Sequence, residues 1–263
     1  MTRKSSPAEM LRSEDEETRH EAFERVASEM SDELAREVLA IGSGDGHPDV
    51  RADAVIALGP IVEECGMDYV DGDDDEALDL MLAPPLSRET FATIVAKIRG
   101  LYDDSSQPTI VRRRALEVLV RDPQPWQKDA VRAHFRSGDR DWRLTAVFAM
   151  GYLDGFDREL LETLKNETGD LLFEAVRSAG ERETPGAAPI IAALARSPDA
   201  DEDARLAAIA ALPMIDRRSA GLLEELAGSD DEEIAEAAQE ALEELRMYSM
   251  GGEGSLYDGD DDV

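Results

Sequence analysis

Cysteine and long apolar runs are nearly absent from this chain. Cys65 is the single cysteine in 263 residues, so no disulfide can form within the chain, and a lone thiol fits a reducing compartment. No run of about 18 apolar residues occurs, and the first residues contain no apolar segment of the kind that directs secretion. We therefore expect a cytoplasmic protein that does not insert into a membrane.

Lysine and aromatic residues are also scarce. Only four of the 28 basic residues are lysines and 5% of the chain is aromatic, whereas 60 acidic residues give a net charge of −32. This composition resembles that of proteins from halophilic archaea, although an ordinary acidic protein is the alternative. Because such a charge repels phosphate backbones, we expect no nucleic-acid partner, while a basic protein partner is compatible with it.

One eleven-residue pattern recurs along the chain. It begins with an acidic residue followed by an apolar residue and often Arg, has Ala at the sixth position, and closes on a Leu-like residue and often Gly. Its clearest copies are DVRADAVIALG, from Asp49 to Gly59, and DWRLTAVFAMG, from Asp141 to Gly151. Copies start at 17, 49, 110, 141, 170, 203 and 233. The spacing is near 31 residues, and the one double step, of 61, must hold a degenerate copy.

Each repeat has the pattern of two short helices. A second helical stretch precedes every copy, and Gly, Asp, Ser and Pro separate the two stretches, which are helix stop and start signals. A helix of about 12 residues is marginal alone in water and must bury its apolar stripe against a neighbour. A hairpin that stacks on copies of itself satisfies this requirement.

The repeat resembles HEAT repeats, especially the short subtype first described in phycobilin lyases. The residues that carry the resemblance are Asp49/Arg51, Asp141/Arg143 and Asp203/Arg205, with Ala54, Ala146 and Ala208 at the tight packing position. The resemblance implies an all-α fold, a right-handed α-α superhelix of about seven to eight hairpins whose second helices line the concave surface. Tetratricopeptide repeats fit worse, because the period is shorter than their 34 residues.

The array is expected to cover most of the chain. We predict a flexible N-terminus over 1–7, the solenoid over 8–246, and a disordered acidic tail over 247–263. Residues 63–86 carry an acidic cluster and two consecutive prolines, so an irregular insertion is expected there. The tail contains Tyr248, Leu256 and Tyr257, which offer either a docking motif or a plain solubilising segment.

The Asp and Arg of the motif have a structural explanation. An Asp at the helix start can accept hydrogen bonds from free N–H groups and suits the helix dipole. The Arg two positions later can pair with acidic groups of the adjacent repeat. We therefore interpret these residues as a structural ladder and not as a functional site.

No catalytic, cofactor or metal site emerges from the sequence. Iron-binding hydroxylases of the HEAT-like class use several His-Glu pairs, whereas this chain has only His20-Glu21. An aspartate-rich loop begins like an EF-hand at Asp71 but has Glu76 where Gly is needed and Leu82 where Glu is needed. No nucleophile elbow or phosphate-binding loop occurs. We therefore expect no enzyme, no cofactor and no metal.

One helix face changes from polar to apolar or basic along the array, and this change is the best indication of a functional surface. Positions 4, 8 and 12 of the motif follow one another every four residues, and in HEAT arrays this face should look into the groove. It is polar in the first and last repeats and apolar or basic in the central ones. The candidate partner-binding residues are Arg113, Glu117, Arg121, Leu144, Phe148, Tyr152, Phe173, Arg177, Leu206 and Met214.

These observations lead to one main hypothesis and one alternative. The main hypothesis is a non-catalytic, monomeric scaffold or adaptor that binds a protein partner along the concave face of the central repeats. Aromatic anchors, an apolar centre and an Arg rim are what a protein-binding groove needs. The opposing explanation is that a neighbouring helix or the tail covers this face. The alternative function is a lyase-like or protein-modifying enzyme of the HEAT-like class, or a subunit of one.

Overall fold

The computed structural model describes residues 5–70 and 85–251, and every regular element in them is an α-helix. The chain divides into two compact units, residues 1–145 and 146–263, with the boundary inside α9 (Arg140–Met150). The first unit also contains α1 (Pro7–Leu11), α2 (Glu16–Ser28), α3 (Asp32–Gly42), α4 (Pro48–Ile56), α5 (Gly59–Val70), α6 (Arg88–Asp103), α7 (Thr109–Leu119) and α8 (Gln127–Phe135). The second contains α10 (Asp157–Asn166), α11 (Asp170–Glu181), α12 (Ala188–Arg196), α13 (Glu202–Ile215), α14 (Ala220–Leu226) and α15 (Glu232–Gly251).

The helices confirm the predicted all-α fold of repeated hairpins. Every copy of the motif is the second helix of a pair, and each of these helices begins at the first motif residue or one residue before it. The hairpins among the described residues are α1/α2, α3/α4, α6/α7, α8/α9, α10/α11, α12/α13 and α14/α15. The motif and the helix start together because the apolar motif positions form one stripe of the helix. That stripe must be buried against the adjacent hairpin, which fixes the orientation of each second helix.

The double step contains one extra helix in its described part. Helix α5 begins at Gly59, directly after α4, and packs against α6 and α7. The predicted insertion at 63–86 therefore starts inside a helix, and its central residues 71–84 lie outside the described residues. At the C-terminus, α15 continues to Gly251, beyond the predicted limit of 246. Residues 252–263 of the predicted tail also lie outside the described residues.

The capping aspartates lie two residues before the predicted position. Asp15 and Asp201 directly precede their helices and accept the N–H three residues ahead, at N···O distances of 2.9 and 3.2 Å. Asp49, Asp141 and Asp203 lie inside the first turn instead. Only the residue before the helix can aim its side-chain oxygen at these N–H groups. The motif aspartates are thus not the caps, although their charge still suits the positive end of the dipole.

The motif arginines close their own hairpins. The Nε of Arg51 donates to the carbonyl of Gly42 at 3.2 Å, and the Nε of Arg205 donates to the carbonyl of Ala195 at 3.0 Å. Both acceptors lie at the C-terminal end of the first helix, where carbonyls have no partner within the helix. Arg51 also reaches Gln107 of the next hairpin at 2.5 Å. These two side chains therefore bind carbonyl and amide oxygens in place of the predicted acidic groups.

An ion pair between repeats does occur at the same motif position of the first hairpin. The Nε of Arg19 lies 2.6 Å from a carboxylate oxygen of Asp53, and the guanidinium is almost fully buried. The pKa of Arg19 is raised because of its hydrogen bond with Asp53. In α9 the corresponding Arg143 lies over the ring of Phe135, with Cζ 5.4 Å from the centroid. The arginines at this motif position thus contact partners that differ from repeat to repeat.

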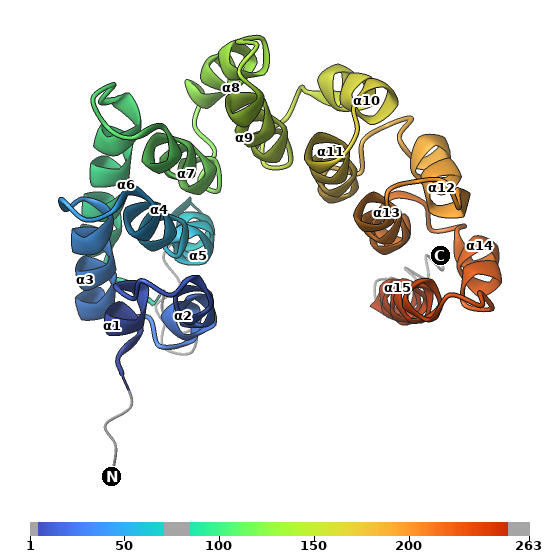
Figure 1. Cartoon of the computed structure of the whole chain (residues 1–263), viewed down its shortest axis with the longest axis horizontal. Coiled ribbons are helices and arrows are strands. Elements are labelled where there is room, and N and C mark those ends of the chain that lie inside the picture. The colour runs from blue at the N-terminus through green and yellow to red at the C-terminus, as the bar shows by residue number, and fades with distance from the viewer. Residues whose placement is uncertain (1–4, 71–84, 252–263) are drawn as a thin grey trace, which may run out of the picture. The chain divides into compact units, whose positions relative to one another are not determined.

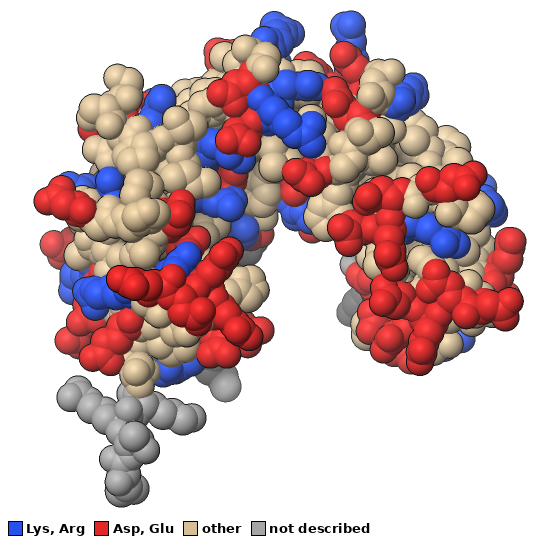
Figure 2. Space-filling model, in the orientation of Figure 1, with Lys and Arg blue, Asp and Glu red and all other residues tan. Residues whose placement is uncertain are grey.

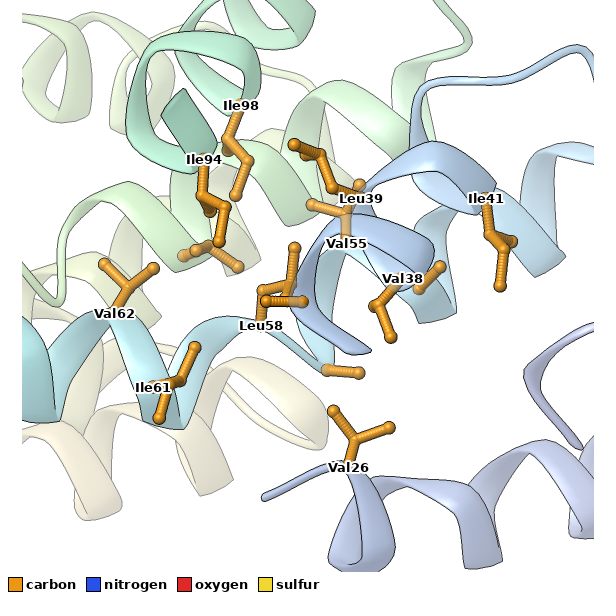
Figure 3. Close-up of a cluster of buried hydrophobic side chains, with 14 of the residues drawn as sticks. Val26, Val38, Leu39, Ile41, Val55, Leu58, Ile61, Val62, Ile94 and Ile98 are labelled. Carbon is orange, nitrogen blue, oxygen red and sulfur yellow. The ribbon is translucent and has the colours of Figure 1, made fainter. Parts of the chain in front are cut away.

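The core of the first unit is aliphatic. Side chains from α1 to α7 meet in one cluster, part of which Figure 3 shows, and most of them are branched residues with little or no exposed surface. The labelled members are Val26, Val38, Leu39, Ile41, Val55, Leu58, Ile61, Val62, Ile94 and Ile98. Gly42 allows α3 to approach α4 closely, because a Cβ at this position would lie 2.8 Å from a methyl of Val55.

The second unit consists of two helical layers. Helix α13 packs against both α11 and α15, so the second helices of three hairpins form one layer. Helices α10, α12 and α14 each pack against the second helix of their own hairpin and form the other layer (Figure 1). One face of α11, α13 and α15 is therefore left without a covering helix among the described residues.

An aromatic cluster joins α6, α8 and α9 within the first unit. The hydroxyl of Tyr102 lies 2.9 Å from Nε2 of His134, and the imidazole stacks on Trp142 with centroids 3.8 Å apart and planes 7° apart. The guanidinium of Arg99 lies over Trp126, 3.4 Å from its centroid. Cation–π and stacking contacts of this kind stabilise the packing beyond the apolar area that they bury.

This cluster predicts a pH-dependent stability. Burial lowers the pKa of His134, nearby Arg112 lowers it further, and Asp139 opposes them. The folded state thus disfavours the proton, while the unfolded state takes it up near pH 6.5. The contribution of His134 to the free energy of unfolding should therefore be fully present above about pH 7 and be lost as the pH drops through 6.5.

Urea unfolding followed by tryptophan fluorescence measures this effect, because both tryptophans of the chain lie in the cluster. The comparison is between the wild type and His134→Gln at about pH 7.5 and 5.5, a range that brackets the ordinary His pKa. The variant should lose less stability between the two pH values than the wild type. An equal loss in both proteins would show that His134 does not cause it.

Candidate functional site

The uncovered face of the second unit contains an apolar groove of about 560 Å³. Phe173 and Arg177 on α11 form one wall, and Leu206 and Met214 lie on α13. All four were expected from the sequence to face a partner, and the structure brings them together. Phe173 is 38% exposed, one of two large apolar side chains in the described residues with so much surface in contact with solvent.

Small residues make this face hollow. Ala207, Ala210 and Ala211 of α13 and Ala237 of α15 line the groove between the larger side chains. Small residues also let α11 and α13 approach closely, because a Cβ on Gly180 of α11 would lie 3.0 Å from the Cβ of Ala211 on α13. The groove therefore forms because α11 and α13 pack tightly while the outward side chains stay short.

The wall on α15 is acidic. Glu233, Glu236 and Glu240 line this side of the groove. The side chain of Glu233 hydrogen-bonds that of Glu202 and raises the pKa of Glu202. Glu236 and Glu240 are exposed, are one helical turn apart, and have no hydrogen-bond or ion-pair partner among the described residues. Figure 2 shows acidic side chains gathered over the part of the chain that contains α15.

The single cation of the groove lining is neutralised from its own helix. Arg177 lies 2.7 Å from a carboxylate oxygen of Glu174 and 3.7 Å from one of Glu181. Burial alone would lower the pKa of Arg177, but the charge and hydrogen bond of Glu174 outweigh it and raise that pKa. Arg177 therefore stays charged, and the net charge around the groove is negative.

Two more predicted residues lie beside Arg177. The guanidinium is 4.9 Å from the ring centroid of Phe148, and the rings of Phe148 and Tyr152 are 5.3 Å apart. Both rings are half-buried at the C-terminal end of α9, within the second unit. The Phe148 ring offers an aromatic face to the guanidinium, and both rings lie next to the groove residues of α11.

The predicted residues of the first unit are mostly committed to internal contacts. Arg113 is 8% exposed and donates from Nε to the hydroxyl of Thr145 at 3.0 Å. Glu117 is 3% exposed and accepts from the same hydroxyl at 2.6 Å. The next repeat thus covers these two positions, so we revise their assignment from partner contact to packing.

The other two predicted residues of this unit are partly accessible. Arg121 is half-buried and pairs with Glu63 of α5 at 2.6 Å. Leu144 is half-buried on α9. The candidate site that the structure defines therefore consists of residues of the second unit alone.

The acidic wall is the part of the site that the sequence reasoning missed. Glu236 and Glu240 occupy motif positions 4 and 8 of the last repeat, the same positions as Phe173 and Arg177 in α11. From the sequence they are simply part of the polar face of a terminal repeat. Their motif positions could have identified them, because identical motif positions on adjacent second helices face the same groove.

The described residues contain no cluster of three or more His, Cys, Asp or Glu side chains suited to a metal ion. The EF-hand-like segment from Asp71 to Leu82 lies outside these residues. None of the helices in the described ranges combines the length and apolarity that crossing a membrane requires.

Comparison with known proteins finds similarity to solved structures alone. No protein-family model matches the chain, and no curated protein sequence matches it. The structure of human deoxyhypusine hydroxylase in complex with glycerol has a TM-score of 0.38 and 12% sequence identity, and the match covers 92% of this chain and 95% of that chain. That protein is an enzyme, which contradicts the sequence-based prediction that this chain is not one, and we withdraw that prediction. The chain is thus similar to a helical HEAT-like repeat protein.

Proposed function

We propose that the chain is an interaction scaffold that binds a protein partner through the groove of α11, α13 and α15. The observation that carries the proposal is the apolar groove on an uncovered helical layer, with Phe173 in contact with solvent at its wall. Exposed apolar surface of this kind, edged by charged residues, is typical of protein-binding sites. Affinity would come from burial of Phe173, Leu206 and Met214 against a partner's apolar side chains.

The high negative charge agrees with a protein partner better than with nucleic acid, since it repels phosphates. We further propose a cytoplasmic, monomeric protein of a halophilic archaeon, with repeats of the short lyase-like HEAT subtype. In molar salt the Debye length is about 3 Å, so contacts within the groove would supply most of the affinity.

Site-specific photo-crosslinking tests the proposal. A photoreactive phenylalanine analogue replaces Phe173 in one protein and Ile190, a half-buried residue of the outer helix α12, in the control. We expect a crosslinked protein at position 173 that is absent at position 190. The identified partner, once purified, should bind the wild type at least about 30-fold more tightly than Leu206→Asp, because a buried anchor is worth about 2 kcal/mol or more.

The controls separate a lost groove from a lost fold. Leu206→Asp should retain the far-UV circular dichroism of the wild type, and Ile190→Asp should retain affinity for the partner. Equal affinity of Leu206→Asp and the wild type would contradict the proposal.

A second candidate is a lyase-like or protein-modifying enzyme, or a subunit of one. This candidate is retained because deoxyhypusine hydroxylase, to which the chain is similar, is an enzyme. Elemental analysis and the absorption spectrum of the purified protein test it. A metal or chromophore bound in stoichiometric amount would support it, and the absence of both would count against it.

A further inference from the structure

We infer that the occupant of the groove is a short amphipathic helix with apolar anchors on one face and Arg or Lys side chains, one turn apart, along the edge of that face. This inference rests on the proposed function and specifies the chemistry of the partner. Three features of the groove support it: the nature of its lining, the imbalance of its charges, and the arrangement of the charges along α15.

The lining favours a helix over an extended peptide. The groove is formed by side chains of three helices, whose backbone N–H and C=O groups are paired within the helices. Phe173, Leu206, Met214 and the alanines between them offer no hydrogen bonds to a ligand backbone. An extended peptide would bury unpaired backbone groups there, whereas a helix satisfies its own. Helices that bind in grooves insert anchors spaced three, four and seven residues apart.

The charges favour a basic ligand. Arg177 is the single cation of the groove lining, and Glu174 and Glu181 neutralise it. Glu236 and Glu240 on the opposite wall are exposed and have no cationic partner among the described residues. A ligand that approaches this wall thus meets two unbalanced carboxylates, and an acidic ligand would be repelled.

The spacing of these carboxylates sets the spacing of the cations. Residues four apart on a helix are neighbours on one face, so Glu236 and Glu240 lie in a row along the edge of the groove. A ligand helix packed alongside α15 would present cations to both if its basic residues are also three or four positions apart. Arg suits this contact better than Lys, because its planar fork matches a carboxylate.

The same charges argue against two other occupants. Residues 252–263 of this chain contain five acidic residues and no basic one. A second copy of the chain carries a net charge of −32. Either occupant would add negative charge beside Glu236 and Glu240.

Fluorescence anisotropy with three designed peptides tests the inference on the full chain. Each peptide has about 16 residues and an alanine-rich helical background. The basic peptide has leucines on one face and two arginines four residues apart beside them. The acidic peptide has glutamates in place of the arginines, and the scrambled peptide has the composition of the basic one without an apolar face. Binding is measured in about 1 M salt and at the lowest salt at which the circular dichroism is unchanged.

The expected result is an order of affinities together with its response to variants. At the lower salt the basic peptide should bind about 10-fold more tightly than the acidic and scrambled peptides. Glu236→Gln/Glu240→Gln should weaken it about 5- to 10-fold, as for two exposed ion pairs. The matched control Glu224→Gln/Glu225→Gln removes two exposed charges from outer helix α14 and should change it less than about 2-fold. In about 1 M salt the loss of affinity caused by Glu236→Gln/Glu240→Gln should become smaller, whereas Leu206→Asp should still abolish binding.

Other results would overturn the inference in distinguishable ways. If the basic and acidic peptides bind equally and Leu206→Asp abolishes both, the groove binds a helix but the basic character is wrong. If Glu224→Gln/Glu225→Gln weakens binding as much as Glu236→Gln/Glu240→Gln does, the attraction comes from the overall negative charge of the chain and not from the groove. If no peptide binds, the helical occupant is wrong, and the crosslinking at Phe173 separately decides whether the groove binds a protein at all.

Discussion

Replacing Phe156 with alanine should destabilise the second unit by about 3–5 kcal/mol, the usual cost of removing a buried aromatic side chain. Phe156 is 1% exposed and directly precedes the first helical residue of α10, where it is among the largest fully buried side chains of the described residues. Because α10 packs on α11, its loss should also loosen the helix that carries Phe173 and Arg177.

Hydrogen exchange of the backbone amides measures this effect where it is expected. Both tryptophans lie in the first unit, so their fluorescence does not report on α10. Phe156→Ala should speed exchange in α10 and α11 and leave α3, α4 and α6 of the first unit unchanged. The matched control Phe156→Leu retains most of the volume and should cost about 1.5 kcal/mol or less. A loss of less than about 1 kcal/mol in the alanine variant would contradict the burial on which the prediction rests.

Replacing Glu117 with alanine should lower the free energy of unfolding of the first unit by about 2–3 kcal/mol. The carboxylate is 3% exposed, accepts from the Thr145 hydroxyl at 2.6 Å and pairs with Arg114 at 2.5 Å. Removing one partner of a buried pair costs about 3–5 kcal/mol, but Arg114 is partly exposed and can turn to water, which reduces the loss.

Urea unfolding followed by tryptophan fluorescence gives this value, because Trp142 lies on α9 close to Thr145 in sequence. A double-mutant cycle with Thr145→Val isolates the contact. The double variant should recover part of the loss, with a coupling of about 1 kcal/mol or more. Additive losses would mean that the hydroxyl and the carboxylate do not depend on each other.

Most of the fold could be predicted from the sequence, because the motif records a packing requirement that is the same in every repeat. The position of each second helix follows from its buried stripe, and Ala54, Ala146 and Ala208, expected at the tight packing position, are all fully buried. The sequence predicts a degenerate copy between Asp49 and Ile110 but not the bounds of helix α5, because the motif is lost there and no adjacent copy sets the register.

The site could be predicted less well, because exposure depends on the neighbouring hairpin and not on the motif. Arg113 and Phe173 occupy the same motif position, yet Arg113 is covered by Thr145 and Asp141 whereas Phe173 stays in contact with solvent. A pattern within one helix cannot distinguish these two outcomes. The acidic wall was missed for a related reason: Glu236 and Glu240 are ordinary surface residues until α13 places an apolar groove beside them.

The central claim is that the face shared by α11, α13 and α15 is where a partner binds. Methyl NMR spectra of the full chain, labelled at Ala and Met and recorded with and without the partner identified by crosslinking, test it most directly. We expect the resonances of Ala207, Ala210, Ala237 and Met214 to shift on binding, while that of Ala115, buried in the first unit, stays in place. Saturating binding that leaves these four methyl groups unshifted would contradict the account.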